Sequence, residues 1–333
     1  GATYCHDRIY GGGEALCIHN PATGREQSMP HVIAPAGTRR RVVVVGAGPG
    51  GLEAARVAAE RGHEVTVFEA AGDPGGQIRL TARNPRRREM IGIIDWRMAQ
   101  CAARDVTFRF NTWAEAADVT ALDPDVVIVA TGGLPNLALF EQPGEAAHVT
   151  SAWDVIAGDV RLSGSVLVYD ESGDHPGLQA AEAALEMGAE VEVMTPDRTF
   201  APEIMSMTLT PYIRALQGRV QMTLMRRLLG VARDGNRLLA RIGTDFSDLV
   251  EERTFDHVVV NHGTVPLDEL YFDLRDLSVN RGETDHAALI AGRAQAIRSN
   301  PAGRFQLFRI GDAVSARNTH AAIYDALRLL KDL

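Results

Sequence analysis

Hydrophobic positions in this chain fall into short apolar runs that alternate with longer segments of helical pattern. The runs at 42–45 and 126–130 are apolar throughout, and the run at 65–68 is apolar except for Thr66, which is typical of strands buried on both faces of a parallel sheet. Segments at 89–103 and 176–187 carry apolar residues at helical spacing. The alternation therefore predicts an α/β protein. The other predicted strands are 106–110, 165–169, 190–194, 257–261 and 305–310, and a last helix is predicted at 319–331.

A glycine-rich turn follows the first apolar run, at Gly46-Ala47-Gly48-Pro49-Gly50-Gly51, and we call it the first turn. Gly46 permits a tight exit from the strand, Gly48 lets backbone approach a pyrophosphate, and Gly51 lets the next helix pack close to the sheet. Pro49 and Gly50 stand where that helix begins, so its positive end would face the phosphates. The first turn thus predicts a dinucleotide site, with a tight turn that binds nothing as the alternative.

An acidic residue stands at the end of the second apolar run. Glu69 lies 23 residues beyond Gly46 and is followed by Ala70. A carboxylate there accepts hydrogen bonds from a ribose diol and repels a 2′-phosphate. The spacing therefore predicts a site for FAD, ADP or NAD and disfavours NADP.

The composition is that of a globular protein, because 45% of the 333 residues are hydrophobic and 23% are charged. A net charge of −9 and a pI near 5.6 argue against binding to nucleic acid or to anionic lipid. No apolar run approaches the roughly 20 residues that span a bilayer. The three cysteines form no disulfide framework, which agrees with a reducing compartment. We expect a cytoplasmic protein with neither a nucleic-acid partner nor a membrane partner.

Residues 1–33 show little periodic pattern and contain Cys5 and Cys17. Two cysteines in a loop ahead of a nucleotide domain could ligate an iron–sulfur cluster, which normally takes four Cys ligands. Two free thiols are the alternative.

A second strand–turn–helix unit begins at 165–169, but its turn differs from the first. The segment Asp170-Glu171-Ser172-Gly173-Asp174-His175-Pro176-Gly177, which we call the second turn, carries three carboxylates where a pyrophosphate needs bare amides. Like charges repel, so we expect poor dinucleotide binding there. His262 follows a later strand and could contact a ligand or be structural. Strands expected at 220–224, 226–233, 237–242 and 250–255 would form a β-meander.

The first turn with its following residues, VVVVGAGPGGLEAA, the Cys5 to Ala22 segment and the closing RIGDAVSARNTHAAIYDALRLLKDL together resemble a known family. They are similar to the linker and C-terminal half of the iron–sulfur flavoproteins that include trimethylamine, dimethylamine and histamine dehydrogenases and 2,4-dienoyl-CoA reductase. The closing segment most resembles the dimethylglycine and N-methylproline demethylase branch. The resemblance covers essentially the whole chain, and it implies that an N-terminal TIM barrel with FMN and the substrate site lies outside it.

The resemblance also implies roles for further residues. Gly76 and Gln77 would pass close to the flavin or its ribityl chain, Ala130-Thr131-Gly132 would touch the dinucleotide, and Gly311-Asp312 would bind the ribityl hydroxyls, unless Asp312 only caps a helix. Cys5 and Cys17 would match the third and fourth ligands of a 4Fe–4S cluster, whose second ligand would fall at Gly1 or Ala2, neither of which is Cys. The cofactor of the first domain would be FAD, or ADP in its place.

The resemblance further implies a domain order and a function. We expect a linker at 1–33, a FAD- or ADP-binding domain at 34–160 plus 299–333, and an inserted NAD(P)-like domain at 161–298, both domains being three-layer Rossmann-like folds. The complete protein would oxidatively demethylate an N-methyl amine or amino acid and pass electrons through the cluster to an electron-transferring flavoprotein. This chain alone would be inactive, and it would join the barrel or a partner subunit in a homo- or hetero-oligomer. The alternatives are an NAD(P)H-dependent reductase module of the dienoyl-CoA type and a non-catalytic docking module.

Overall fold

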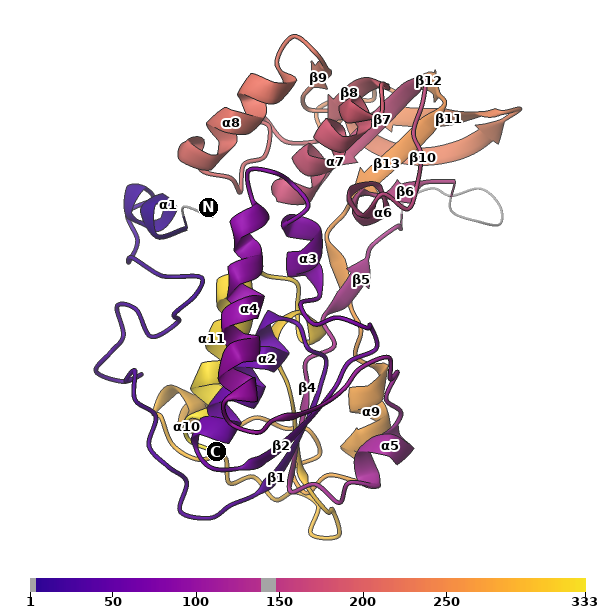
Figure 1. Cartoon of the computed structure of the whole chain (residues 1–333). Helices are drawn as coiled ribbons and strands as arrows, with labels where there is room; N and C mark the ends of the chain where they lie inside the picture. Colours follow the sequence, from indigo (N-terminus) through magenta and orange to yellow (C-terminus); the bar gives the residue numbers. More distant parts are fainter. Residues whose placement is uncertain (1–3, 139–147) are drawn as a thin grey trace. The chain divides into compact units, whose positions relative to one another are not determined.

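The computed structural model describes residues 4–138 and 148–333, and the chain divides into two compact units. The first unit comprises Gly1–Leu134 and Val265–Leu333, and the second comprises Pro135–Thr264. The second unit is therefore inserted in the first, as Figure 1 shows by the colours of the ribbon. The chain passes between the units at β5 (Gly133–Pro135) and β14 (Thr264–Pro266).

A five-stranded parallel sheet forms the centre of the first unit, with the strand order β15-β4-β1-β2-β3. Every residue of the central strand β1 after Arg41 is buried, which accounts for its unbroken run of valines. The strands are β1 (Arg41–Val45), β2 (Glu64–Phe68), β3 (Thr107–Arg109), β4 (Val126–Val129) and β15 (Gln306–Arg309).

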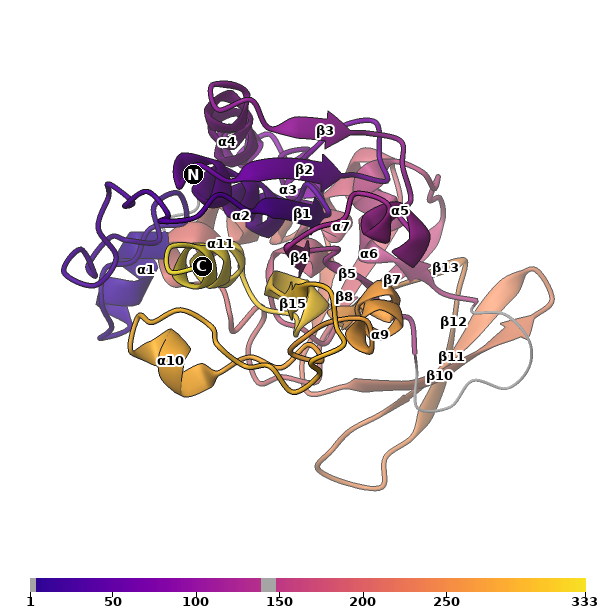
Figure 2. The same ribbon diagram turned by 90° about the horizontal axis from the view of Figure 1, so that it is seen from below.

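Helices cover both faces of this sheet, which gives three layers (Figure 2). Val42 and Val44 pack in one core with α2 (Pro49–Glu60), α4 (Gly92–Ala102) and α11 (Thr319–Leu330). Val43 and Val45, which point the other way, pack in a second core with α5 (Ala116–Thr120) and α9 (Glu269–Arg275). The shorter helices are α1 (Tyr4–Tyr10), α3 (Gln77–Thr81), η1 (Arg88–Ile91), α10 (His286–Ile290) and η2 (Gly311–Ala313).

The second unit has its own five-stranded parallel sheet, with the order β6-β13-β7-β8-β9. Val166 and Val168 of β7 face a core that includes residues of α6, α7 and α8, whereas Leu167 and Tyr169 face a three-stranded antiparallel sheet. The parallel strands are β6 (Thr150–Ser151), β7 (Ser165–Asp170), β8 (Glu190–Met194), β9 (Gln221–Thr223) and β13 (His257–Asn261). The antiparallel strands are β10 (Arg227–Asp234), β11 (Arg237–Gly243) and β12 (Glu251–Phe255), and the helices are α6 (Ala152–Ala157), α7 (His175–Glu186) and α8 (Ser206–Leu216).

The α/β class, the inserted arrangement and the strand–helix order agree with the sequence, but three details differ. The domain boundary expected after residue 160 falls earlier, because β6 pairs with β13 and so belongs to the second unit. The boundary expected at 298 also falls earlier, because α9 packs on the first sheet. The expected strand at 220–224 is β9, which pairs in parallel with β8, so the meander has three strands and not four.

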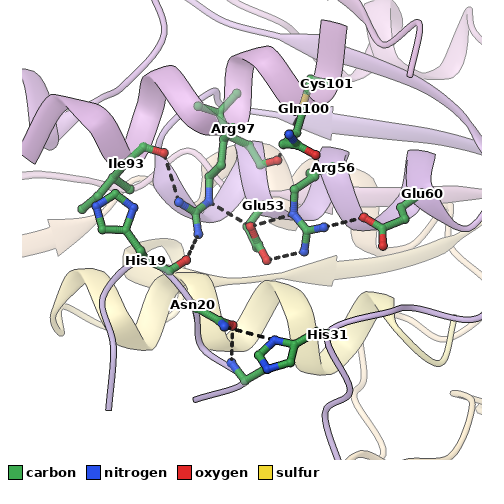
Figure 3. A network of polar contacts seen from close by, with 12 residues as sticks. His19, Asn20, His31, Glu53, Arg56, Glu60, Ile93, Arg97, Gln100 and Cys101 are labelled. Carbon is green, nitrogen blue, oxygen red and sulfur yellow. Dashed lines mark hydrogen bonds and ion pairs between the residues drawn. The ribbon is translucent and has the colours of Figure 1, made fainter. Parts of the chain in front are cut away.

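A buried charge network attaches the N-terminal segment to helices α2 and α4 of the first unit (Figure 3). Glu53 of α2 is 1% exposed, and its carboxylate accepts hydrogen bonds from Arg97 Nε at 2.8 Å and from Arg56 Nη2 at 2.8 Å. Arg97 is 0% exposed and also donates to the backbone carbonyl of His19 at 2.8 Å. Residues near Cys17 are therefore fixed to the helix that begins at the first turn.

Among the described helices, none has both the length and the apolarity that crossing a membrane requires.

Candidate nucleotide-binding site

The first turn joins the end of β1 to the start of α2, and two of its glycines are required by close backbone contacts. A Cβ on Gly46, whose φ is 103°, would collide with the carbonyl of Ala130. A Cβ on Gly51 would collide with the carbonyl of Gly46. These contacts bring α2 tightly against the sheet, as the glycine spacing predicted.

The start of α2 is open at the position between those glycines. Gly48 is the N-cap residue, and no described side chain caps this end of the helix. A Cβ on Gly48 would have no described atom within 4 Å. The first N–H groups of an α-helix have no partner within the helix, so this end presents donors and a positive dipole to open space. Such a position suits a phosphate.

Glu69 lies beside this helix start. Its Oε2 accepts a hydrogen bond from the N–H of Ala47 at 2.7 Å, and its Oε1 accepts one from the N–H of Ala71 at 2.8 Å. Ala70, which lies between Glu69 and Ala71 in the chain, is exposed. A carboxylate oxygen has two acceptor positions, so each oxygen keeps one for an additional donor. The side chain is therefore fixed in place and can still accept a hydroxyl pair.

The glycine turn at 75–77 packs directly on the first turn. The N–H of Gly75 donates to the carbonyl of Ala47 at 2.8 Å, and a Cβ on Gly76 would lie 3.4 Å from Cα of Gly48. Gln77 begins α3, and its Nε2 donates to Oδ2 of Asp312 at 3.0 Å. The contact joins two segments that are 235 residues apart in the chain.

The Gly311-Asp312 corner contacts α11 and Gln77. A Cβ on Gly311 would lie 3.2 Å from Cβ of Ala322, and one on Gly50 would lie 3.3 Å from the carbonyl of the same Ala322, so α11 touches both segments. Asp312 accepts a second hydrogen bond from the N–H of Arg317 at 3.2 Å, and burial raises the pKa of its carboxyl group. Asn318 caps α11, so Asp312 is not the cap of that helix.

Ala130-Thr131-Gly132 continues β4 past the first turn. The N–H of Ala130 donates to the carbonyl of Val45 at 2.8 Å, and a Cβ on Gly46 would lie 3.1 Å from Cα of Thr131. The Thr131 hydroxyl donates to the carbonyl of Leu267, and the N–H of Leu267 donates to the carbonyl of Gly132 at 3.1 Å. Contacts with the first turn thus come from three predicted segments, through Glu69, Gly76 and Ala130-Thr131, and Asp312 is linked to this set through Gln77. Ala70 and Gly132 are the chain neighbours of Glu69 and Thr131.

The two cysteines predicted as cluster ligands lie in the N-terminal segment. Cys5 lies on α1 and is exposed, while Cys17 is partly buried and its Sγ accepts a hydrogen bond from the N–H of His19 at 3.4 Å. Gly1 and Ala2 lie outside the described residues. The described part of the chain contains no group of three or more side chains placed to hold a metal ion. The residues described therefore do not fit a four-cysteine cluster by themselves.

The second turn is occupied by the chain's own side chains. Asp170 is 2% exposed, and its Oδ1 accepts hydrogen bonds from the N–H of Gly173 at 3.1 Å and from Asn261 Nδ2 at 2.9 Å. A Cβ on Gly177 would clash with the carboxylate of Asp170. Burial, and then the negative charge of Asp174, raises the pKa of Asp170 to about 7. No such carboxylate stands at Gly46 in the first turn.

His262 belongs to the same region of the second unit. Its Nδ1 lies 2.7 Å from Oε2 of Glu171, whose other oxygen accepts from Arg227 at 2.5 Å. Nε2 of His262 is buried and, within the described residues, has no hydrogen-bond partner. The hydrogen bond and burial support the structural interpretation of this histidine over direct contact with a ligand.

Comparison with protein families agrees with this architecture. The family described as pyridine nucleotide-disulphide oxidoreductase matches residues 40–325, and the chain belongs to it. This family is made of oxidoreductase domains of the FAD/NAD type. The match begins just before β1 and ends within α11, so it includes both glycine turns.

Individual relatives define the branch. The chain is 63% identical over its whole length to a probable N-methylproline demethylase of Rhizobium meliloti (strain 1021), and it covers 49% of that protein. It is 44% identical over its whole length to an N,N-dimethylglycine/sarcosine dehydrogenase of Chromohalobacter salexigens and covers 50% of that protein. A solved 2-naphthoyl-CoA reductase complex matches the whole chain with a TM-score of 0.81 and 25% identity, and the chain covers 46% of it. The resemblance seen in the sequence is confirmed, and the chain spans about half the length of these relatives.

Proposed function

We propose that this chain is the FAD- or ADP-binding half of a flavoprotein that oxidatively removes a methyl group from an N-methyl amine or N-methyl amino acid. The observation that carries the nucleotide site is the start of α2, which lacks a side-chain cap at Gly48 and has Glu69 fixed beside it. The substrate class is supported by the two relatives whose names specify N-methylproline and dimethylglycine.

Each residue has a definite part in this proposal. The amides of the first turn bind the pyrophosphate, and the free acceptor positions of Glu69 receive the ribose hydroxyls. Asp312 accepts from a ribityl hydroxyl when the ligand is FAD. A bound FAD would supply electron transfer, whereas ADP would have a structural role only.

The complete protein's electron route is a further part of the proposal. The resemblance supports an FMN-containing barrel, a 4Fe–4S cluster and an electron-transferring flavoprotein as acceptor. The described residues supply two of the four cysteines that such a cluster normally takes, so we assign no step to it within this chain. Assembly with the barrel, in the same polypeptide or in a partner subunit of an oligomer, belongs to the same proposal.

Nucleotide binding can be tested on the chain itself. Mass spectrometry of the supernatant after denaturation should detect FAD or ADP, and calorimetry should detect binding of one of them to nucleotide-free protein. The variant Gly48→Ala should keep the stability of the wild type, because the added methyl meets open space, but should weaken nucleotide binding at least about tenfold by filling the phosphate position. Gly37→Ala, which also meets open space, is the matched control and should bind normally. If neither nucleotide binds, or if Gly48→Ala binds normally, the proposed site is wrong.

The activity needs the complete protein. The full-length protein should release formaldehyde from N-methylproline or dimethylglycine with an artificial electron acceptor and without NAD(P)H. Absence of formaldehyde with every N-methyl amino acid tried would contradict the substrate class, even if FAD is bound.

An NAD(P)H-dependent reductase is the second candidate, and the structural match to 2-naphthoyl-CoA reductase favours it. It requires a working second nucleotide site. Asp170 occupies the second turn and faces Gly177, which argues against that site. Rapid flavin bleaching by NADH or NADPH under anaerobic conditions would support the reductase and overturn our choice.

A further inference from the structure

The hydrogen bond between Gln77 and Asp312 is a contact of the site that the glycine spacing does not predict. Gln77 Nε2 lies 3.0 Å from Asp312 Oδ2, and both side chains are partly buried. Gln77 directly follows Gly76, which packs on Gly48 at the start of α2. The pair therefore connects the phosphate end of the site to the Gly311-Asp312 corner.

The contacts divide the site into two parts that serve different portions of a ligand. Glu69 and the first turn are joined through Ala47, and these groups suffice for an adenosine diphosphate. Asp312 makes no contact with that part except through Gln77, among the interactions found in the described residues. A ligand that ends at the second phosphate does not need Asp312, whereas FAD continues into a ribityl chain with hydroxyl donors.

Two donors hold the Asp312 carboxylate, one on each oxygen. Gln77 donates to Oδ2, and the N–H of Arg317 donates to Oδ1 at 3.2 Å. Each oxygen keeps one acceptor position, so the carboxylate can still receive a ribityl hydroxyl. An ionised carboxylate in place of the Gln77 amide could not donate to Asp312 and would repel it.

We infer that Gln77 is a positioning residue that gives the site its preference for FAD over ADP, because it holds Asp312 where the ribityl chain leaves the pyrophosphate. This inference rests on the proposed function, since it assumes that the first turn binds an adenine nucleotide. Gln77 acts through Asp312 and not on the nucleotide itself.

Affinity for FAD and for ADP, measured separately by calorimetry on nucleotide-free protein, tests this inference. Gln77→Ala should weaken FAD binding about tenfold, the worth of one charge-assisted hydrogen bond, and leave ADP binding within about twofold. Asp312→Ala should weaken FAD binding more and also spare ADP. Gln77→Glu should weaken FAD binding at least as much as Gln77→Ala, because it adds repulsion. Gln27→Ala, a change at an exposed glutamine in the N-terminal segment, is the control and should alter neither affinity.

The double variant Gln77→Ala/Asp312→Ala distinguishes positioning from a general structural role. If Gln77 acts only through Asp312, the double variant binds FAD as Asp312→Ala does. A full additional tenfold loss in the double variant, an equal loss of FAD and ADP in Gln77→Ala, or wild-type protein that takes ADP but not FAD would each overturn the inference. Wild-type protein that binds neither nucleotide would instead refute the proposed function.

Discussion

The buried carboxyl group of Asp170 should make the second unit less stable at alkaline pH, and Asp170→Asn should remove this effect. Asp170 is 2% exposed and accepts two hydrogen bonds on Oδ1, from Gly173 N–H and Asn261 Nδ2. An asparagine amide oxygen can accept the same two hydrogen bonds. The substitution therefore removes the charge and keeps the contacts.

The size of the effect comes from the shift in pKa. Burial and the neighbouring Asp174 raise the pKa of Asp170 from 3.8 to about 7. Between about pH 4 and pH 7 the carboxyl group is protonated in the folded state and ionised in the unfolded state. The free energy of unfolding therefore falls as the pH rises through this range. A shift of about 3 units corresponds to about 4 kcal/mol in total, of which about 3 kcal/mol falls between pH 5 and 8.

Urea unfolding at pH 5 and pH 8, followed by the fluorescence of Trp153, measures this effect in the second unit alone. Trp153 lies in α6 of the second unit, whereas the other two tryptophans, Trp96 and Trp113, belong to the first unit. Both of these are replaced by phenylalanine in the parent protein and in the Asp170→Asn variant. Asp170→Asn should be more stable than its parent by about 4 kcal/mol at pH 8 and by less than about 2 kcal/mol at pH 5. A stability difference that does not grow with pH would show that Asp170 is ionised in the native protein and would refute the reasoning.

The remaining predictions concern three single residues of the first unit, Gly51, Cys101 and Glu53. In urea unfolding, Gly51→Ala should destabilise the first unit by about 3 kcal/mol or more, because the added methyl collides with the Gly46 carbonyl. The control is Gly92→Ala, whose methyl meets open space in a helix and should cause no measurable loss of stability. Burial raises the pKa of the Cys101 thiol to about 12. Ellman's reagent at pH 8 should therefore label the exposed Cys5 and not Cys101. Rapid labelling of Cys101 in the native protein would contradict its burial. Glu53→Gln should cost about 3–5 kcal/mol because it leaves Arg97 buried without its partner charge, while Glu64→Gln in the exposed pair with Arg39 should cost less than about 1 kcal/mol. Burial opposes ionisation of Glu53, but Arg97 and Arg56 outweigh burial and lower its pKa, so its contribution to stability is present above about pH 4.5 and should be lost as the pH falls below that value.

The first turn could be predicted from the sequence because its chemistry is local. Gly51 avoids a collision with the carbonyl of Gly46, which the strand–turn–helix connection itself brings close, so the spacing of these two glycines is fixed within a few residues. Glu69 follows from the same unit, because β1 and β2 are adjacent parallel strands and their carboxyl ends meet. Glycine spacing and a strand-end acid therefore carry enough information to place one half of the site.

The Gln77–Asp312 bond and the domain boundaries depend on tertiary contacts that no local pattern encodes. Gln77 and Asp312 are 235 residues apart, and nothing around either residue indicates its partner. The strand β6 has two residues, too few for a hydrophobic pattern, and only its pairing with β13 assigns it to the second unit. The burial of Arg56 and Arg97 is equally unpredictable from local pattern, because an arginine on a helix is usually exposed. Both are buried here and form ion pairs with Glu53.

Comparison of the two turns explains why one fold, used twice, gives one proposed nucleotide site. In both turns the last glycine of the motif has no room for a side chain, but Gly51 faces the backbone carbonyl of Gly46 whereas Gly177 faces the carboxylate of Asp170. In the second turn the N–H of Gly173 already donates to Asp170, so this amide is not available to a nucleotide phosphate. A second carboxylate, that of Glu171, is held beside the turn by Arg227 and His262. We therefore expect no nucleotide site at the second turn, whereas the first turn should lose much of its nucleotide affinity through the single change Gly48→Ala.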